Sequence, residues 1–167
     1  MAKRITTAGA FTALALIFSY VEVLIPFNFG IPGIKLGLAN LVVVTGLYFL
    51  NWKDVCLISL IRILISGILF GNGVSLIYSF TGGILSFIFM MAAKKTNIFS
   101  IAGVSVIGAV FHNIGQIAAA SFVMKTMVIT YYLPILMISG VATGFLLGII
   151  SANVLPILEK QLNNKIS

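Results

Sequence analysis

Three ionisable side chains interrupt long apolar runs of the chain: Glu22, Arg62 and His112. An arginine at the centre of a membrane helix costs about 2.5–3.5 kcal/mol on insertion scales, so such residues usually face a protein interior or a water-filled cavity. We therefore expect these three side chains to face the interior of a helix bundle and to mark a functional site.

Arg62 shares a helix face with Ser59 and Ser66, which lie three residues before and four residues after it. Its planar guanidinium is suited to a phosphate or carboxylate group, which predicts an anion-binding residue. The alternative is a structural ion pair with Glu22. Glu22 itself either binds a donor on the substrate or neutralises Arg62 or Lys35.

His112 begins the run His112-Asn113-Ile114-Gly115-Gln116, in which His112 and Gln116 share a helix face. One interpretation is a hydrogen-bonding pair that lines an outward-facing cavity together with Asn113. The other is a histidine satisfied by a neighbouring helix. The chain has one histidine and one cysteine, so we predict neither a metal site nor a disulfide.

The composition predicts the elements that position these residues. The chain is 60% hydrophobic and 8% charged, whereas soluble domains are about a quarter charged. We predict an all-α membrane protein with a single transmembrane domain, residues 1–167. Apolar runs indicate six spans: Ile5–Ile25, Leu36–Leu50, Val55–Phe70, Val74–Ala93, Ser100–Val123 and Tyr131–Leu158.

The basic residues predict the orientation of these spans. Six spans with the N-terminus and the C-terminus inside place seven basic residues in the cytoplasm and two outside, as the positive-inside rule favours. The inner seven are Lys3, Arg4, Lys53, Lys94, Lys95, Lys160 and Lys165, and the outer two are Lys35 and Lys125. These residues act as topology signals, so we expect no nucleic-acid partner. The expected location is the bacterial cytoplasmic membrane, with the lipid bilayer around the chain.

This orientation gathers polar side chains in the outer half of the predicted bundle. We predict a substrate-binding pocket that opens outward and is formed by Glu22, Lys35, Asn40, Arg62, Asn72, His112, Asn113 and Gln116. The segment 26–35 contains two prolines and two glycines and cannot be regular helix. It is either a lid over this pocket or a plain connector.

Small residues at four-residue spacing lie near the N-terminus: Ala8 with Thr12, and Gly9 with Ala13. Such spacing lets helices approach closely, so this face either docks a partner helix or packs internally. The chain lacks a Walker phosphate loop, and its single aspartate, Asp54, cannot hold catalytic Mg²⁺. We therefore expect neither ATP hydrolysis nor any other catalysis by this chain, and no cofactor.

Several motifs resemble one bacterial membrane family, heptaprenyl diphosphate synthase component I, also called the Gx transporter family. They are PGIKLGLAN at 32–40, Arg62, Phe70-Gly71-Asn72-Gly73, and GAVFHNIGQ at 108–116. The resemblance covers nearly the whole chain.

This family is similar to the substrate-binding (S) components of energy-coupling-factor transporters. The resemblance implies a small six-helix bundle that binds a small molecule from outside and docks through its first helix. It also implies a transmembrane coupling subunit and two ATPase subunits as partners. The family name implies an isoprenoid phosphate or a quinone precursor as cargo, with Arg62, Lys35 and His112 facing the phosphate. The alternatives are a non-catalytic membrane subunit of a prenyl diphosphate synthase and a stand-alone secondary transporter.

Overall fold

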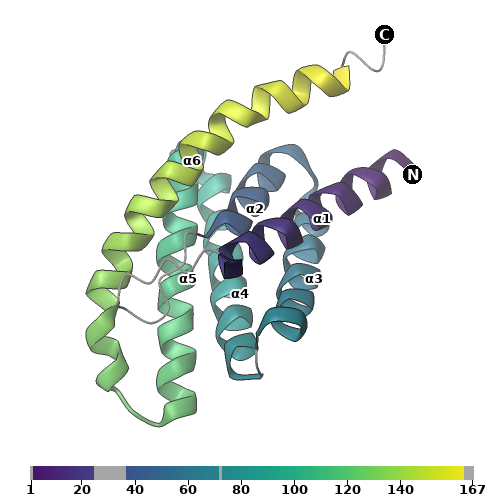
Figure 1. The fold of residues 1–167 in the computed structure, drawn as a ribbon. Coiled ribbons are helices and arrows are strands. Elements are labelled where there is room, and N and C mark those ends of the chain that lie inside the picture. Colours follow the sequence, from purple (N-terminus) through teal and green to yellow (C-terminus); the bar gives the residue numbers. More distant parts are fainter. Residues whose placement is uncertain (1, 25–36, 72, 164–167) are drawn as a thin grey trace.

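The computed structural model describes residues 2–24, 37–71 and 73–163. Apart from short connections, these residues are helical (Figure 1). The elements in chain order are α1 (Ala2–Leu24), α2 (Leu38–Phe49), α3 (Trp52–Phe70), α4 (Gly73–Thr96), α5 (Ile101–Met124), the 3₁₀ helix η1 (Val128–Tyr132) and α6 (Leu133–Asn163). The predicted all-α fold is confirmed. The predicted loop 26–35 and Asn72 lie outside the described residues.

Helix length and composition support a multi-pass membrane protein. Four helical segments in the described part of the chain are long and apolar enough to cross a bilayer: Arg4–Leu24, Gly73–Thr96, Ile101–Met124 and Val128–Gln161. Helix α3 is similar in length to these four segments, but the charged residues Lys53, Asp54 and Arg62 interrupt its apolar sequence. Helix α2 has 12 residues. The count of six spans and the inward orientation of both termini therefore stay predictions.

Four predicted boundaries differ from the helix ends by three to five residues, at the starts of α1 and α3 and at the ends of α4 and α6. The predicted spans Leu36–Leu50 and Val55–Phe70 left residues 51–54 as a polar turn between them, but α3 begins at Trp52. The Asn51 side chain accepts a hydrogen bond from the backbone amide of Lys53 at 3.3 Å and so caps the N-terminus of α3. Likewise, Lys94 and Lys95 belong to the last turn of α4. Basic side chains at a helix C-terminus stabilise the helix, because they interact favourably with its dipole.

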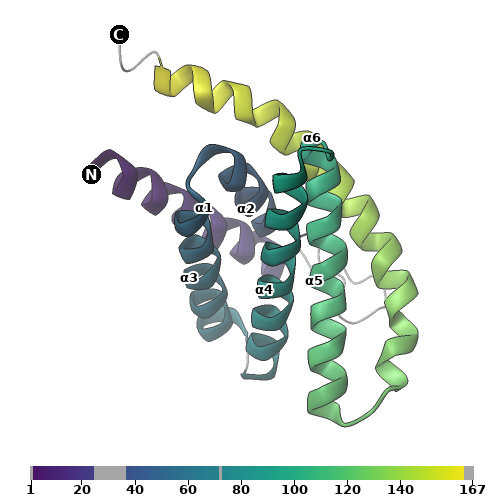
Figure 2. The same cartoon turned by 180° about the vertical axis from the view of Figure 1, so that it is seen from behind.

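The short helix α2 lies at the centre of the bundle. It packs against α1, α3, α5 and α6, and residues 42–47 are buried. Its Val43, Val44 and Leu47 join a core with α3, α4 and α5, while Val42 joins a second core with α1 and α3. Helix α1 crosses the bundle obliquely, and the N-terminal end of α1 and the C-terminal end of α6 lie toward the same end of the bundle (Figures 1 and 2). At this end Arg4 forms a two-bonded salt bridge with Asp54, with both hydrogen bonds 2.7 Å long.

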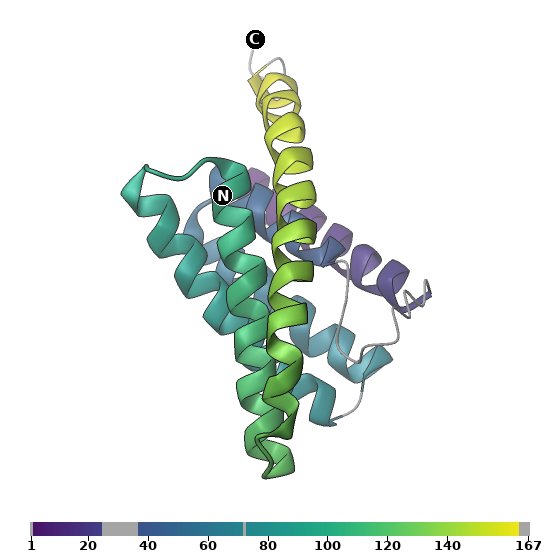
Figure 3. The ribbon, with the colours of Figure 1, turned by 90° about the vertical axis from the view of Figure 1, so that its left-hand side faces the viewer.

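Helices α5 and α6 lie side by side (Figure 3) because glycines on α6 let the two backbones touch. Gly140, Gly144 and Gly148 follow one another at four-residue spacing. A Cβ atom added at Gly144 would lie 2.8 Å from the Cα of Val106, and one at Gly148 would lie 2.5 Å from the Cα of Ala102. This small-residue pattern is one that membrane helices use for close packing.

The Lys94 side chain holds the C-terminal end of α2. Its ammonium group donates a hydrogen bond to the backbone carbonyl of Leu47 and lies 4.8 Å from the ring centroid of Tyr48. A cation at a helix C-terminus satisfies a carbonyl that lacks an intrahelical partner and complements the helix dipole. The cation–π contact adds to this attraction.

We expect Lys94→Met to lower the free energy of unfolding by about 1–3 kcal/mol, because it removes a hydrogen bond from a charged donor. The measurement is thermal unfolding of purified protein in detergent. Lys95→Met is the matched control, since the Lys95 side chain is exposed. Equal melting temperatures for the two variants would contradict a structural role for Lys94.

Candidate substrate-binding cavity

A cavity of about 470 Å³ lies between the six α-helices. Pockets for small molecules usually enclose about 300–1,000 Å³. Every α-helix contributes side chains to its wall, and the wall is rich in polar groups. The polar lining residues are Ser19, Glu22, Asn40, Ser59, Arg62, Ser66, Ser75, Ser79, Ser86, His112, Asn113, Gln116 and Thr143.

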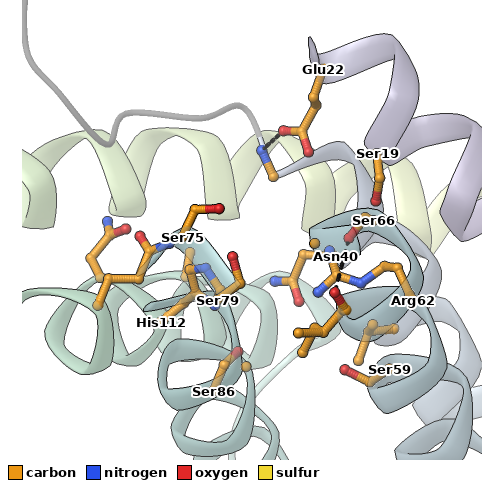
Figure 4. A pocket seen from close by; sticks show the side chains of 18 of the residues that line it. Ser19, Glu22, Asn40, Ser59, Arg62, Ser66, Ser75, Ser79, Ser86 and His112 are labelled. Atoms are coloured by element: carbon orange, nitrogen blue, oxygen red, sulfur yellow. Dashed lines mark hydrogen bonds between the residues drawn. The ribbon is translucent and has the colours of Figure 1, made fainter. Parts of the chain in front are cut away.

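Arg62 lies on the cavity face of α3 with Ser59 and Ser66, as their spacing predicted. Figure 4 shows its side chain reaching from α3 toward Asn40 on α2. The Nε atom of Arg62 is buried and has no hydrogen-bond partner. Because a guanidinium stays charged at physiological pH, this donor is costly unless something in the cavity binds it.

Glu22 has a partner that the sequence did not indicate. Its carboxylate accepts hydrogen bonds from the backbone amides of Gly37 and Leu38, the latter at 3.1 Å, and thereby caps the N-terminus of α2 (Figure 4). Gly37 has a φ of 72°, a left-handed conformation that glycine adopts without strain. Within the described residues the only salt bridge is that of Arg4 with Asp54, so Glu22 and Arg62 do not form the ion pair considered above.

We expect Glu22→Ala to destabilise the protein by about 0.5–2 kcal/mol, the usual cost of losing a helix N-cap. Glu22→Gln keeps a carbonyl oxygen as acceptor but loses the charge that favours the helix N-terminus, so its melting temperature should lie between those of the Glu22→Ala variant and the parent. Thermal unfolding measures both, with Glu159→Gln as the control because Glu159 is exposed. A Glu22→Ala variant as stable as the parent would show that the cap is dispensable.

The α5 wall of the cavity carries His112, Asn113 and Gln116. The side-chain amide of Asn113 donates a 2.6 Å hydrogen bond to the carbonyl of Leu136 on α6, so it also ties two helices together. Gly82 on α4 lies directly against this wall, where an added Cβ would be 2.8 Å from the carbonyl oxygen of His112 and 2.9 Å from Cγ of Gln116. Glycine at this position therefore lets α4 approach the backbone at His112 and leaves space for the Gln116 side chain.

The cavity brings together most of the predicted site residues. Glu22, Asn40, Arg62, His112, Asn113 and Gln116 all line it. Lys35 and Asn72 lie outside the described residues.

Sequence reasoning missed the hydroxyl groups of α4 and α6. Ser75, Ser79 and Ser86 line one side of α4, and Thr143 lines α6. Ser86 is 2% exposed, and its Oγ atom has no hydrogen-bond partner. The signal was present, because Ser75, Ser79 and Ser86 are separated by four and seven residues and so share a helix face.

The four residues predicted to dock a partner divide between two faces of α1. Ala8 and Thr12 are half-buried, and the Thr12 hydroxyl donates a 2.9 Å hydrogen bond to the Ala8 carbonyl. Gly9 and Ala13 are exposed, and a Cβ added at Gly9 would meet no atom within 4 Å. Only Gly9 and Ala13 thus lie on an open surface.

The family model for heptaprenyl diphosphate synthase component I matches residues 11–154. The chain belongs to this family. The match covers all six α-helices in whole or in part and the whole lining of the cavity. No curated protein and no solved structure matches the chain. Membership in the component I family agrees with the multi-pass membrane fold, and its name points to one component of a larger assembly.

Proposed function

We propose that this component I protein is the substrate-binding subunit of an energy-coupling-factor type importer. Its cargo is a small amphipathic molecule with an acidic group, taken from the outer side of the membrane. The family name suggests two classes of cargo, isoprenoid phosphates and quinone precursors. The chain captures this molecule and does not transform it.

The observation that carries the proposal is the buried Nε atom of Arg62, which has no hydrogen-bond partner and lies in a cavity walled by six helices. A buried donor without a hydrogen-bond partner on a charged group is expensive, and intramembrane charges usually mark functional sites. In a substrate-binding protein, an anionic ligand that pairs with Arg62 offsets this cost. Glu22 and Asn113, which hydrogen-bond backbone groups around the cavity, keep its walls in place when it is empty.

The second part of the proposal is a docking surface on α1 at Gly9 and Ala13. Both residues are exposed, and small side chains let a partner helix approach the backbone closely. The expected partners are a transmembrane coupling subunit and two ATPase subunits, which supply the energy that this chain does not.

The competing function is a non-catalytic membrane subunit of a prenyl diphosphate synthase, which the family name favours. Affinity purification from native membranes in mild detergent, followed by mass spectrometry of the bound proteins, separates the two. Recovery of two ATPases and a coupling subunit supports the importer. Recovery of a soluble prenyl synthase without ATPases supports the competing function. Uptake by vesicles that contain this chain alone would support a stand-alone secondary transporter.

Substitutions on α1 sharpen this experiment. We expect Gly9→Leu and Ala13→Leu to reduce recovery of the coupling subunit at least tenfold while the protein stays folded. Ala118→Leu is the matched control, because Ala118 is an exposed alanine on α5. Unchanged recovery with all three variants would place the docking surface elsewhere.

A further inference from the structure

The Glu22 carboxylate has two oxygens, and the α2 cap uses one of them. The backbone amides of Gly37 and Leu38 both donate to Oε1, the latter at 3.1 Å. No residue that the structure describes donates a hydrogen bond to Oε2, and Figure 4 shows this second oxygen directed toward the inside of the cavity. We infer that Oε2 accepts a hydrogen bond from the cargo, which therefore carries an N–H or O–H group besides its acidic group. This inference rests on the proposed function.

The cap leaves the acceptor capacity of Glu22 half used. An ionised carboxylate has about four lone-pair sites on its two oxygens, and the two amides occupy those of Oε1. In the low-dielectric interior of a helix bundle, a hydrogen bond to a charged oxygen is strong, and an oxygen left without one is costly. A donor on the ligand would remove that cost.

Glu22 and Arg62 line the same cavity with opposite charges. They lie close enough for the carboxylate to act on the guanidinium electrostatically, but the only salt bridge within the described residues joins Arg4 to Asp54. The Nε atom of Arg62 also has no hydrogen-bond partner. A ligand between them satisfies both side chains when its acidic group pairs with Arg62 and its donor group bonds Glu22.

The rest of the wall accepts both polar and apolar parts of such a ligand. His112 and Gln116 line the α5 side of the cavity. Apolar side chains line it as well, and they are Val23, Val43, Ile63, Phe70, Met90 and Leu147. The body that connects the acidic group to the donor group can therefore be hydrocarbon.

The test starts from the compound that the protein selects. Ligand-free purified protein is mixed with the combined water-soluble and lipid extracts of bacterial cells, and free compound is then removed. Mass spectrometry identifies what the protein retains, and we expect a compound with an N–H or O–H group apart from its acidic group. A derivative in which methyl groups replace these donor hydrogens then competes with the unmodified compound for the protein.

Glu22→Gln changes the inward oxygen into an N–H donor and keeps a carbonyl oxygen for the α2 cap. We expect the parent protein to prefer the unmodified compound by about tenfold or more, the usual value of a hydrogen bond to a charged group. The Glu22→Gln variant should prefer it by less than about twofold, because the two changes remove the same contact. Glu159→Gln is the matched control, since Glu159 is exposed.

This competition separates a contact with the cargo from a pair between Glu22 and Lys35, which lies outside the described residues. In the second case Glu22→Gln would weaken binding of both compounds equally, and the preference of the parent protein would persist in the variant. That result would overturn the inference and leave a substrate-binding function standing.

Two results with the parent protein alone would also overturn the inference, so that it does not depend on the folding of a variant. One is a retained compound without a donor apart from its acidic group, and the other is equal binding of the unmodified and methylated compounds. Retention of nothing by folded protein would contradict both the inference and the proposed substrate-binding function.

Discussion

Replacing Arg62 with methionine is expected to raise the stability of the empty protein and to abolish ligand retention. The Nε atom of Arg62 is buried without a hydrogen-bond partner, and an unsatisfied buried polar group costs about 1–3 kcal/mol. Methionine is flexible enough to fill the same space without that cost. The two expected effects have opposite signs because the charge serves binding at the expense of folding.

Thermal unfolding of ligand-free protein in detergent measures the first effect, and retention of radiolabelled or mass-identified cargo measures the second. Ile68→Met is the control, since Ile68 lies on α3 and is 75% exposed. A methionine variant that is less stable than the empty parent would show that Arg62 is a structural residue. In that case its interactions hold the bundle together rather than a ligand.

The second large effect is expected at the contact between α5 and α6. Gly148→Leu should lower the free energy of unfolding by about 3 kcal/mol or more, at or above the usual range for overpacking a tight contact. An added Cβ would lie 2.5 Å from the Cα of Ala102 and 3.0 Å from the Cβ of Ser105. Backbone atoms cannot rotate away as a flexible side chain can, so the two helices must separate.

Size-exclusion chromatography and thermal unfolding together report this loss. Gly73→Leu is the matched control, because a Cβ at Gly73 meets no atom within 4 Å. We expect the control to elute as the parent does and Gly148→Leu to aggregate or to melt at a much lower temperature. Similar behaviour of the two variants would mean that α6 can move away from α5 without penalty.

Much of the architecture could be predicted from the sequence, because apolar runs and the polar residues, glycines and prolines between them are local signals. The predicted spans Val74–Ala93 and Ser100–Val123 differ from α4 and α5 by one to three residues at each end. The face shared by Ser59, Arg62 and Ser66 was also predictable, since helical periodicity fixes which residues of one helix lie together.

Contacts between helices could not be predicted in the same way. The role of Glu22 depends on where α2 begins, and nothing near residue 22 shows that its carboxylate reaches Gly37. The Lys94 contact with Leu47 spans 47 positions and turned an expected topology signal into a helix cap. The glycines at 140, 144 and 148 were readable as a packing motif, but their partner, α5, was not.

Helix α2 is short, and its N-terminal end lies at the cavity wall. Its 12 residues span about 18 Å at 1.5 Å per residue, well short of a hydrocarbon core about 30 Å thick. Gly37, Asn40 and Val43, at its N-terminal end, form part of the cavity wall. One further turn at that end would lengthen the helix by about 5.4 Å beyond Gly37, which itself lines the cavity. We therefore expect a short insertion or deletion before residue 38 to change the size of the cavity without a change of fold.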